Sequence, residues 1–360
     1  MNKKSITLNK LCIIVITLVV TLLCIIYRAN NLKENKISKT HEINKQDNEY
    51  LIVGYWENYV DKNPIKLSEI SDLYDIINIT FARNSELNDG TVTFELNEYL
   101  CKNISYSKKE FIEDIKRLQN KGKKVLVAIG GEQGGSFKIT NDHEVNNFVR
   151  SLTNIVDEYN FDGIDIDIET GNLEIEYMEK ATKIFWKKYN GEKMITLNSS
   201  LTDMKSADVN EGKDNFWYKF AVDMKDKLAI VSSRYYNSGT QSGYDYKTIY
   251  SREQGHEAFI ASIVAKQLEN KNLANNNIGI TILVMTEEVK GLPQAYMEPN
   301  KIINTLKVII EGKNLDLDYR NFIPVRAYPE LKAVSIWSIN GDALNNYQMA
   351  NSISTYLKMK

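Results

Sequence analysis

Short apolar runs alternate with amphipathic stretches along the chain from Glu49 onward. The apolar runs are rich in Ile, Val and Tyr, which is typical of buried parallel strands. The first run, "YLIVGYW", is followed at 65–73 by a stretch that can form a short helix. Eight runs predict strands at 50–56, 74–82, 123–131, within 159–171, and at 193–200, 228–237, 278–285 and 332–340.

Helical spacing of apolar residues fills the segments between these runs. The clearest case is 142–159, where the apolar residues from Val145 to Tyr159 form one stripe. Strand and helix therefore alternate eight times, which favours an α/β fold, a single (β/α)8 TIM barrel. The rival fold is an open doubly wound sheet, but no G-x-G-x-x-G follows an early strand. Similar periods predict helices at 108–119, 172–189, 215–226, 253–269, 300–312 and 343–358.

A basic lead precedes a long apolar run at the N-terminus. Three lysines come before Leu11–Tyr27, which carries no charge. This pattern predicts export, with 1–28 as a signal peptide or membrane anchor. We favour an uncleaved anchor that holds a monomer at the cell surface, and a secreted protein after signal cleavage is the alternative. Residues 29–48 are polar and predict a solvated tether, and 49–360 predict the barrel domain.

Composition and charge narrow the range of partners. The chain is 43% hydrophobic and 26% charged, and its formal net charge of -2 argues against nucleic acid as a partner. Cys101 is the one cysteine outside the N-terminal apolar run, so no disulfide framework is expected in the barrel. His41, His143 and His256 are far apart in sequence. We therefore expect no metal site and no cofactor.

Asp165, Asp167 and Glu169 fall at alternate positions, and isoleucine fills the positions between them. Side chains at alternate strand positions share a face, which in a barrel is the interior. Neighbouring charges about 6.5–7 Å apart would repel by about 2–3 kcal/mol at an effective dielectric near 20. The arrangement therefore predicts shared protons and a raised pKa at one member. Glu169 is last in the series, at the barrel mouth where such folds place their chemistry.

Two structural explanations of this acidic alternation fit the sequence less well than a functional site does. Calcium-binding loops interleave acidic residues with Gly and polar residues, whereas isoleucine separates the carboxylates here. A solvated face of an edge strand would tolerate the charges, but a closed barrel has no edge. The alternation therefore favours a functional site.

The segment "DGIDIDIE", Asp162–Glu169, resembles the D-G-x-D-x-D-x-E signature of the family 18 glycoside hydrolases, the chitinase family. Four acidic positions and a glycine at fixed offsets make this motif specific. The resemblance extends from Gly54 to Asp342 through four further motifs near the ends of predicted strands. These are "VGYWENY", "VAIGG" (127–131), "RYYNSG" (234–239) and "IWSINGD" (336–342).

The resemblance implies a mechanism for the acidic series. Glu169 would protonate the leaving glycosidic oxygen and then activate water, while the substrate's acetamido carbonyl attacks the anomeric carbon. Asp167 would hold the acetamido N–H and stabilise the oxazolinium intermediate, so that configuration is retained. Asp165 would share a proton with Asp167. Asp162 would order the start of the strand, and Gly163 would serve the backbone or packing.

The resemblance also implies residues that bind the sugar. Tyr236 would hydrogen-bond the acetamido oxygen and Asn237 would help to fix the distorted sugar. Trp337 would form the floor beneath that sugar. Further aromatic candidates are Tyr55 and Phe81 for the same pocket, and Trp56, Trp217 and Tyr244 for an extended cleft.

The chain departs from the family pattern at four places, which leaves the substrate open. The leading hypothesis is an endo-acting hydrolase of β-1,4-linked N-acetylglucosamine, most simply a chitinase. An endo-β-N-acetylglucosaminidase on N-glycan or cell-wall substrates is the alternative. A sugar-binding lectin on an inactive barrel is a third class, but the presence of Glu169 argues against it. The departures are Ala128, "EQGG" after the third strand, "LNSSL" at the fifth strand and Gly341.

Overall fold

The computed structural model describes residues 50–59, 63–204, 215–236, 257–273, 277–284, 296–313 and 324–359. The predicted segments 1–28 and 29–48 lie outside these ranges, as do Asn237 and Tyr244. Within the ranges, no helix is both long enough and apolar enough to cross a bilayer.

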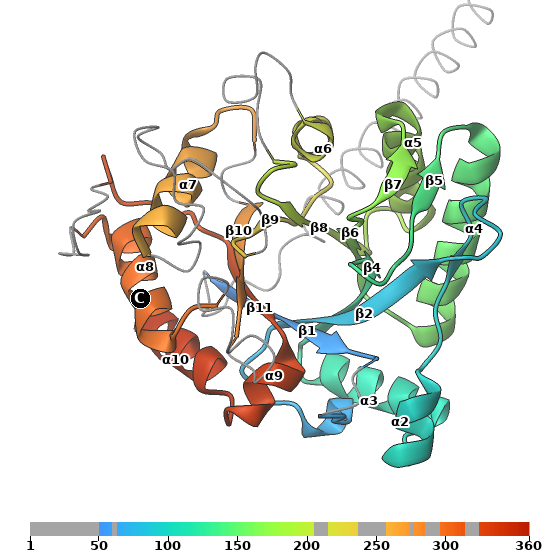
Figure 1. The fold of residues 1–360 in the computed structure, drawn as a ribbon, viewed down its shortest axis with the longest axis horizontal. Helices are drawn as coiled ribbons and strands as arrows, with labels where there is room; N and C mark the ends of the chain where they lie inside the picture. The colour runs from blue at the N-terminus through green and yellow to red at the C-terminus, as the bar shows by residue number, and fades with distance from the viewer. Residues whose placement is uncertain are drawn as a thin grey trace, which may run out of the picture.

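Parallel strands close into a barrel, as the alternating pattern predicted (Figure 1). The pairing order is β1, β11, β10, β9, β8, β6, β4 and β2, and β1 pairs with β2 to complete the ring. This closure excludes the open doubly wound sheet. The barrel strands are β1 (Leu51–Glu57), β2 (Ile76–Asn84), β4 (Lys124–Gly130), β6 (Gly163–Asp167), β8 (Met194–Ser200), β9 (Ile230–Arg234), β10 (Ile278–Leu283) and β11 (Ala333–Trp337).

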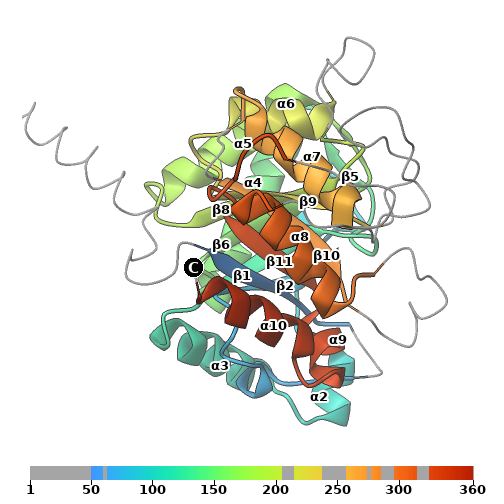
Figure 2. The same cartoon turned by 90° about the vertical axis from the view of Figure 1, so that its left-hand side faces the viewer.

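Helices surround this sheet, with α4 and α5 on one side of it and α8 and α10 on another (Figure 1). Figure 2 shows α8 and α10 side by side on the outside of the barrel. All the predicted helical segments contain a helix. The elements are η1 (Leu67–Glu69), α2 (Glu98–Asn103), α3 (Lys108–Asn120), α4 (Asp142–Tyr159), α5 (Ile175–Lys188), α6 (Phe216–Asp223), α7 (Glu257–Glu269), α8 (Pro299–Glu311), α9 (Ile339–Leu344) and α10 (Gln348–Leu357).

Local capping explains why α4 spans the predicted segment. The Asn141 side chain accepts hydrogen bonds from the backbone N–H groups of His143 and Glu144 at the first turn. Asn160 ends the helix in the left-handed conformation, at φ 56°. Between these caps the apolar stripe is buried against the sheet. Capping and burial therefore agree with the helical period in the sequence.

The barrel interior changes from apolar to polar along the strand direction. Near the strand starts, apolar side chains from different strands form one buried cluster. Further along, buried polar side chains such as Thr196, Asp165 and Thr281 replace them. The sheet therefore presents its polar chemistry toward the C-terminal ends of the strands. The apolar cluster comprises Leu51, Val53, Ile76, Leu126, Met194, Ile230 and Ala333.

A second, small sheet lies beside the barrel and was not predicted. β5 (Phe137–Ile139) pairs in parallel with β7 (Gly171–Leu173). The backbone N–H of Phe137 also donates to the carbonyl of Thr170 at 3.1 Å. Because β7 begins at Gly171, only 168–170 separate it from the end of β6. The remaining short strand, β3 (Val92–Thr93), pairs antiparallel with β2.

Candidate active site

The acidic series begins inside the barrel and ends at its mouth. Asp165 and Asp167 lie on β6 and are 1% and 2% exposed, whereas the Glu169 side chain beyond the strand is 31% exposed. The intervening isoleucines pack in the outer core against the helices. Asp162 orders the start of β6, because its Oδ2 accepts from Val125 N at 2.9 Å. Strand alternation therefore creates a row of carboxyl groups that becomes more accessible toward the mouth.

Asp165 is held by two hydroxyl groups from neighbouring strands. The Tyr55 hydroxyl donates to Oδ2 at 2.9 Å, and Thr196 donates through Oγ1 to Oδ1. Burial raises the pKa of Asp165 to about 6, although these two hydrogen bonds favour its charged form. A carboxyl group of this kind can hold a proton under mildly acidic conditions.

Asp167 combines burial with a cation and two neighbouring carboxylates. Burial is the main reason that its pKa is raised well above the ordinary value. Arg234 opposes that rise, whereas the charges of Asp165 and Glu169 add to it. The Asn198 side chain also stabilises the charged form of Asp167 through a hydrogen bond. The predicted raised pKa is therefore found at both buried members of the series.

Arg234, the last residue of β9, faces the same carboxylates. Its Nη1 atom pairs with Oδ1 of Asp167 and lies 2.7 Å from Oε1 of Glu169. The Arg234 side chain is only 11% exposed. A single nitrogen atom therefore connects the last two members of the acidic series.

Aromatic side chains line the interior beside the acidic series. The Trp337 and Phe81 rings are stacked with centroids 5.6 Å apart, and Tyr55 lies 5.4 Å from Trp337. The Tyr59 ring is also stacked on Phe81, with centroids 6.1 Å apart. A register shift between Ile79 and Ala82 allows Phe81 to leave the outward face that strand alternation would assign to it. The cluster offers flat apolar surfaces next to polar groups.

Tyr236 lies two residues beyond β9 and joins this cluster through Trp337. Its side chain packs with Leu283, Tyr296 and Trp337. Burial raises the pKa of the Tyr236 hydroxyl above its ordinary value, and Arg234 acts in the opposite direction. The hydroxyl therefore remains protonated and can donate a hydrogen bond.

Two glycines at the end of β4 allow the chain to pass close to the site. Gly131 has φ +66°, and a Cβ there would lie 2.3 Å from the Phe81 ring. Gly130 has φ +109°, and a Cβ there would lie 2.5 Å from the Asp167 carbonyl oxygen. The "VAIGG" segment therefore needs both glycines for backbone conformation and for space. Ala128 packs inside the barrel in the cluster with Tyr55 and Phe81.

Two tryptophans that were candidates for the cleft are placed elsewhere. Trp56 is fully buried in the outer core, where its ring lies 6.5 Å from Tyr106 and 5.7 Å from Phe111. Trp217 on α6 is buried against Phe220. The Trp56 prediction is wrong because Tyr55 points inward, and the next residue on a strand points to the opposite face.

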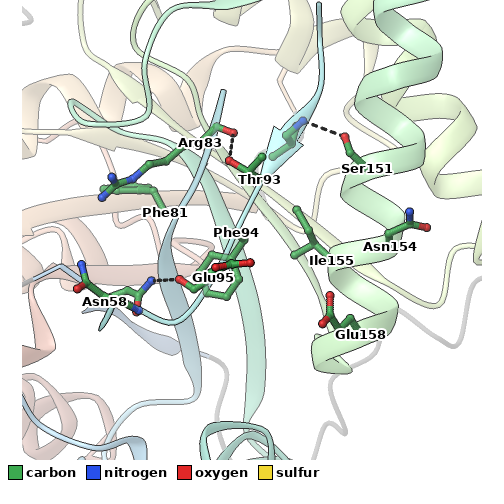
Figure 3. Close-up of a pocket in the computed structure, with 12 residues that line it drawn as sticks. Asn58, Phe81, Arg83, Thr93, Phe94, Glu95, Ser151, Asn154, Ile155 and Glu158 are labelled. Carbon is green, nitrogen blue, oxygen red and sulfur yellow. Dashed lines mark hydrogen bonds between the residues drawn. The ribbon is translucent and has the colours of Figure 1, made fainter. Parts of the chain in front are cut away.

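A separate hollow of about 620 Å³ lies between β3 and α4. Figure 3 shows Phe81 and Arg83 at one edge of this hollow and Asn154 and Glu158 of α4 opposite them. The three members of the acidic series do not line it. The hollow therefore adjoins the candidate site and shares Phe81 with it.

Sequence reasoning missed Arg234, Thr196 and Asn198 as members of the site. Arg234 stands two residues before Tyr236, so strand alternation places both on one face. Thr196 and Asn198 likewise alternate on β8, beside β6. Among the described residues no cluster of His, Cys, Asp and Glu is arranged to hold a metal ion. The cation that the structure places beside the carboxylates is the Arg234 guanidinium.

Comparisons with known proteins agree with this geometry. The sequence profile of the family described as Glycosyl hydrolases family 18 matches residues 51–276. Chitinase D of Niallia circulans is 27% identical over 331 residues, covering 85% of this chain and 61% of that protein. Chitinase Chi52 of Paenibacillus xylanexedens is 25% identical with the same coverage. The chain therefore spans about three-fifths of the length of these relatives.

Solved structures share the barrel. A protein of Streptomyces coelicolor, provisionally described as a chitinase A, superposes with a TM-score of 0.76 and 28% identity. The match covers 87% of this chain and 99% of that one. A chitinase from Chromobacterium violaceum superposes with a TM-score of 0.70 at 24% identity, covering 87% and 84% of the two chains. The second likeness supports the fold alone.

Proposed function

Because the chain belongs to the glycosyl hydrolases of family 18, we propose that it cleaves glycans of β-1,4-linked N-acetylglucosamine, as a chitinase does. The main support is the acidic series, in which two buried carboxyl groups lie behind one accessible carboxyl group. A lectin needs no such series. The aromatic cluster around Trp337 supports the proposal, because flat apolar surfaces suit the C–H face of a sugar ring.

In the proposed reaction, Glu169 protonates the leaving glycosidic oxygen and later removes a proton from water. The acetamido carbonyl oxygen of the substrate attacks the anomeric carbon, so the product retains its configuration. Asp167 accepts a hydrogen bond from the acetamido N–H group. Its negative charge stabilises the positive charge that develops on the intermediate. The Tyr236 hydroxyl donates to the acetamido oxygen, and Asn237, which lies outside the described residues, helps to hold the distorted sugar.

Asp165 acts behind Asp167 in this scheme. The two groups are buried side by side, and the charge of one disfavours ionisation of the other. A proton shared between them lets Asp167 bear its charge when the oxazolinium forms and lose it when the product leaves. The hydroxyl groups of Tyr55 and Thr196 hold Asp165 for this role.

The proposed substrate class is supported by the names of the relatives, which are chitinases. A second substrate class is an N-glycan core or a cell-wall glycan that contains N-acetylglucosamine. It is supported by the segment "LNSSL" at the end of β8, which departs from the family pattern. We also propose that the protein is a monomer and that it works outside the cytoplasm, because an apolar run after a basic lead, as at Leu11–Tyr27, is typical of export signals.

Product analysis of the purified full-length chain tests the proposed function. The chain should release short products with retained configuration from N-acetylglucosamine oligomers and should leave fully deacetylated oligomers intact. A high-mannose glycoprotein and peptidoglycan, tested in parallel, decide between the substrate classes. Efficient cleavage of the deacetylated oligomer would rule out the acetamido group as the nucleophile, and binding of every glycan without cleavage would indicate a lectin.

A further inference from the structure

Arg234 is the group at the site that the proposed reaction leaves without a role. It closes β9 and lies on the same strand face as Tyr236, so its side chain is directed into the barrel mouth. Burying a guanidinium is costly unless carboxylates compensate it. Here Asp167 and Glu169 both compensate the charge of Arg234, and both contact its Nη1 atom. The arrangement fixes these two carboxyl groups relative to each other.

The contact also distinguishes the two oxygen atoms of Glu169. A guanidinium carries five N–H donors and no acceptor, so it can bind only an oxygen that has a lone pair to offer. Oε1 of Glu169 lies 2.7 Å from Arg234. An oxygen that accepts a hydrogen bond from Arg234 does not point a proton of its own toward Arg234. The proton for the leaving group is therefore carried on the other oxygen, Oε2.

We propose that Arg234 is a positioning residue that holds Oε1 of Glu169 beside Asp167 and directs the acidic proton, on Oε2, toward the glycosidic oxygen. This inference rests on the proposed function, because it assigns Glu169 the role of general acid. Arg234 does not itself touch the reacting atoms. It acts on the step in which the glycosidic bond breaks.

Other ionisable groups lie around Arg234 in the barrel interior. Asp165 and Asp167 come from β6, Tyr55 comes from β1, Glu169 follows β6 and Tyr236 follows β9. Burial disfavours the charge of Arg234, but Asp167, Tyr236 and Glu169 outweigh burial, so the pKa of the guanidinium is raised. Arg234 therefore remains charged throughout the working range.

The test compares Arg234→Gln and Arg234→Lys in the full chain on two substrates. With an N-acetylglucosamine oligomer, Arg234→Gln should lower kcat roughly 10- to 100-fold, as expected for a lost charge-assisted hydrogen bond. With a nitrophenyl glycoside, whose leaving group needs little protonation, the loss should be at least about tenfold smaller. A defect in folding would lower both rates equally.

The conservative variant provides a second readout. Arg234→Lys keeps the positive charge beside Asp167 and Glu169, but an ammonium group lacks the planar fork of the guanidinium. It should restore only part of kcat on the N-acetylglucosamine oligomer, and it should reduce the difference between the two substrates.

Arg117→Gln is the matched control. Arg117 on α3 also pairs with a buried carboxylate, since its Nη1 lies 2.8 Å from Oδ1 of Asp114 in the helix layer. This variant should leave kcat and the leaving-group dependence unchanged. The proposal is overturned if Arg234→Gln loses activity equally on both substrates, or if Arg234→Lys has the same kcat as Arg234→Gln on both.

The wild-type chain reports separately on the proposed function. If the wild type cleaves deacetylated chains efficiently, the substrate's acetamido group is not the nucleophile. The Arg234 variants can then still be compared on the deacetylated substrate. If the wild type cleaves no glycan, the proposed function fails and thermal unfolding tests the pairing. Arg234→Gln should then lower Tm more than Arg117→Gln does, because Arg234 is 11% exposed and pairs with two carboxyl groups, whereas Arg117 is 55% exposed and pairs with one. An equal loss in the two variants would overturn the inference.

Discussion

The Tyr55 hydroxyl on β1 donates a 2.9 Å hydrogen bond to Asp165 on β6, across the interior of the barrel. This bond joins two strands that do not pair with each other. It favours the charged form of Asp165, whereas burial favours the neutral form and is the stronger effect. The protonation of Asp165 is therefore coupled to folding, and it can be followed through stability.

Stability should fall as the pH rises from about 4 to about 6, in part because of Asp165. Its pKa of about 6 in the folded protein exceeds the ordinary value of 3.8. The native state thus holds a proton that the unfolded chain releases, and this contribution is complete below about pH 4 and lost as the pH passes 6. The part due to Asp165 is about 3 kcal/mol. Urea unfolding of the wild type and Asp165→Asn across this range measures it, and equal slopes would contradict it.

In Tyr55→Phe, the pH range over which stability falls should extend to higher pH than in the wild type. The variant removes a donor to the charged form of Asp165 and keeps the ring that packs against Trp337. The pKa of Asp165 should rise further, because one of the two hydroxyl groups that oppose burial is lost. Urea midpoints recorded between pH 5 and pH 8 report the change. A range identical to that of the wild type would mean that the hydrogen bond contributes little in solution.

Glu169→Gln should lower turnover by several orders of magnitude and leave oligosaccharide binding largely intact. The amide has nearly the size of the acid but cannot give up the proton that the leaving group needs. Asp167→Asn should also be severe, and Asp165→Asn milder. Steady-state kinetics and calorimetric binding separate the two effects. Glu98→Gln on the exposed surface of α2 is the control, and near-normal turnover in Glu169→Gln would refute the assignment.

Gly131→Ala should cost more stability than Gly122→Ala. Both glycines have positive φ, +66° and +81°, so both variants incur a backbone cost of about 1–2 kcal/mol. Only Gly131 lies against a side chain, because its added Cβ would approach the Phe81 ring to 2.3 Å, whereas nothing lies within 4 Å at Gly122. Overpacking should add about 1–3 kcal/mol and weaken sugar binding. Equal unfolding free energies for the two variants would contradict this placement of Phe81.

Activity should survive a chelating agent, because the acid, the charge stabilisation and the internal nucleophile of the proposed reaction all come from the chain or the substrate. Hydrolysis of an N-acetylglucosamine oligomer before and after EDTA measures this directly. Restoration of a lost activity by one divalent ion would reassign the acidic series to metal binding.

Alternation along single strands explains what the sequence could predict of the site. The period of two placed Asp165 and Asp167 inside and the isoleucines outside, because helices cover the outer face of the sheet. The same rule, applied to Tyr55, would have placed Trp56 outside. It fails at Phe81, where a register shift intervenes. No local pattern signals β5 and β7, because strands of three residues form through contacts that are distant in sequence.

The position of Arg234 relative to the carboxylates could not be obtained from spacing alone. Alternation predicts that Arg234 and Tyr236 share a face, but the ion pairs depend on which strands lie opposite each other. β9 and β6 are separated by β8 in the ring, and their side chains meet only because the barrel is closed and narrow. A contact across the interior is a property of the assembled barrel.

The pairing of β7 with β5 restricts how this protein could change its choice of glycan. Glu169 stands on a bridge of three residues, 168–170, between the ladder of β6 and the ladder of β7. An insertion or deletion in that bridge would break one ladder or the other and displace the acid. Variation in chain length is therefore excluded at the segment that carries Glu169. Evolution or engineering of new specificities must work through the connections that follow the other barrel strands, while the distance from Asp162 to Leu173 stays constant.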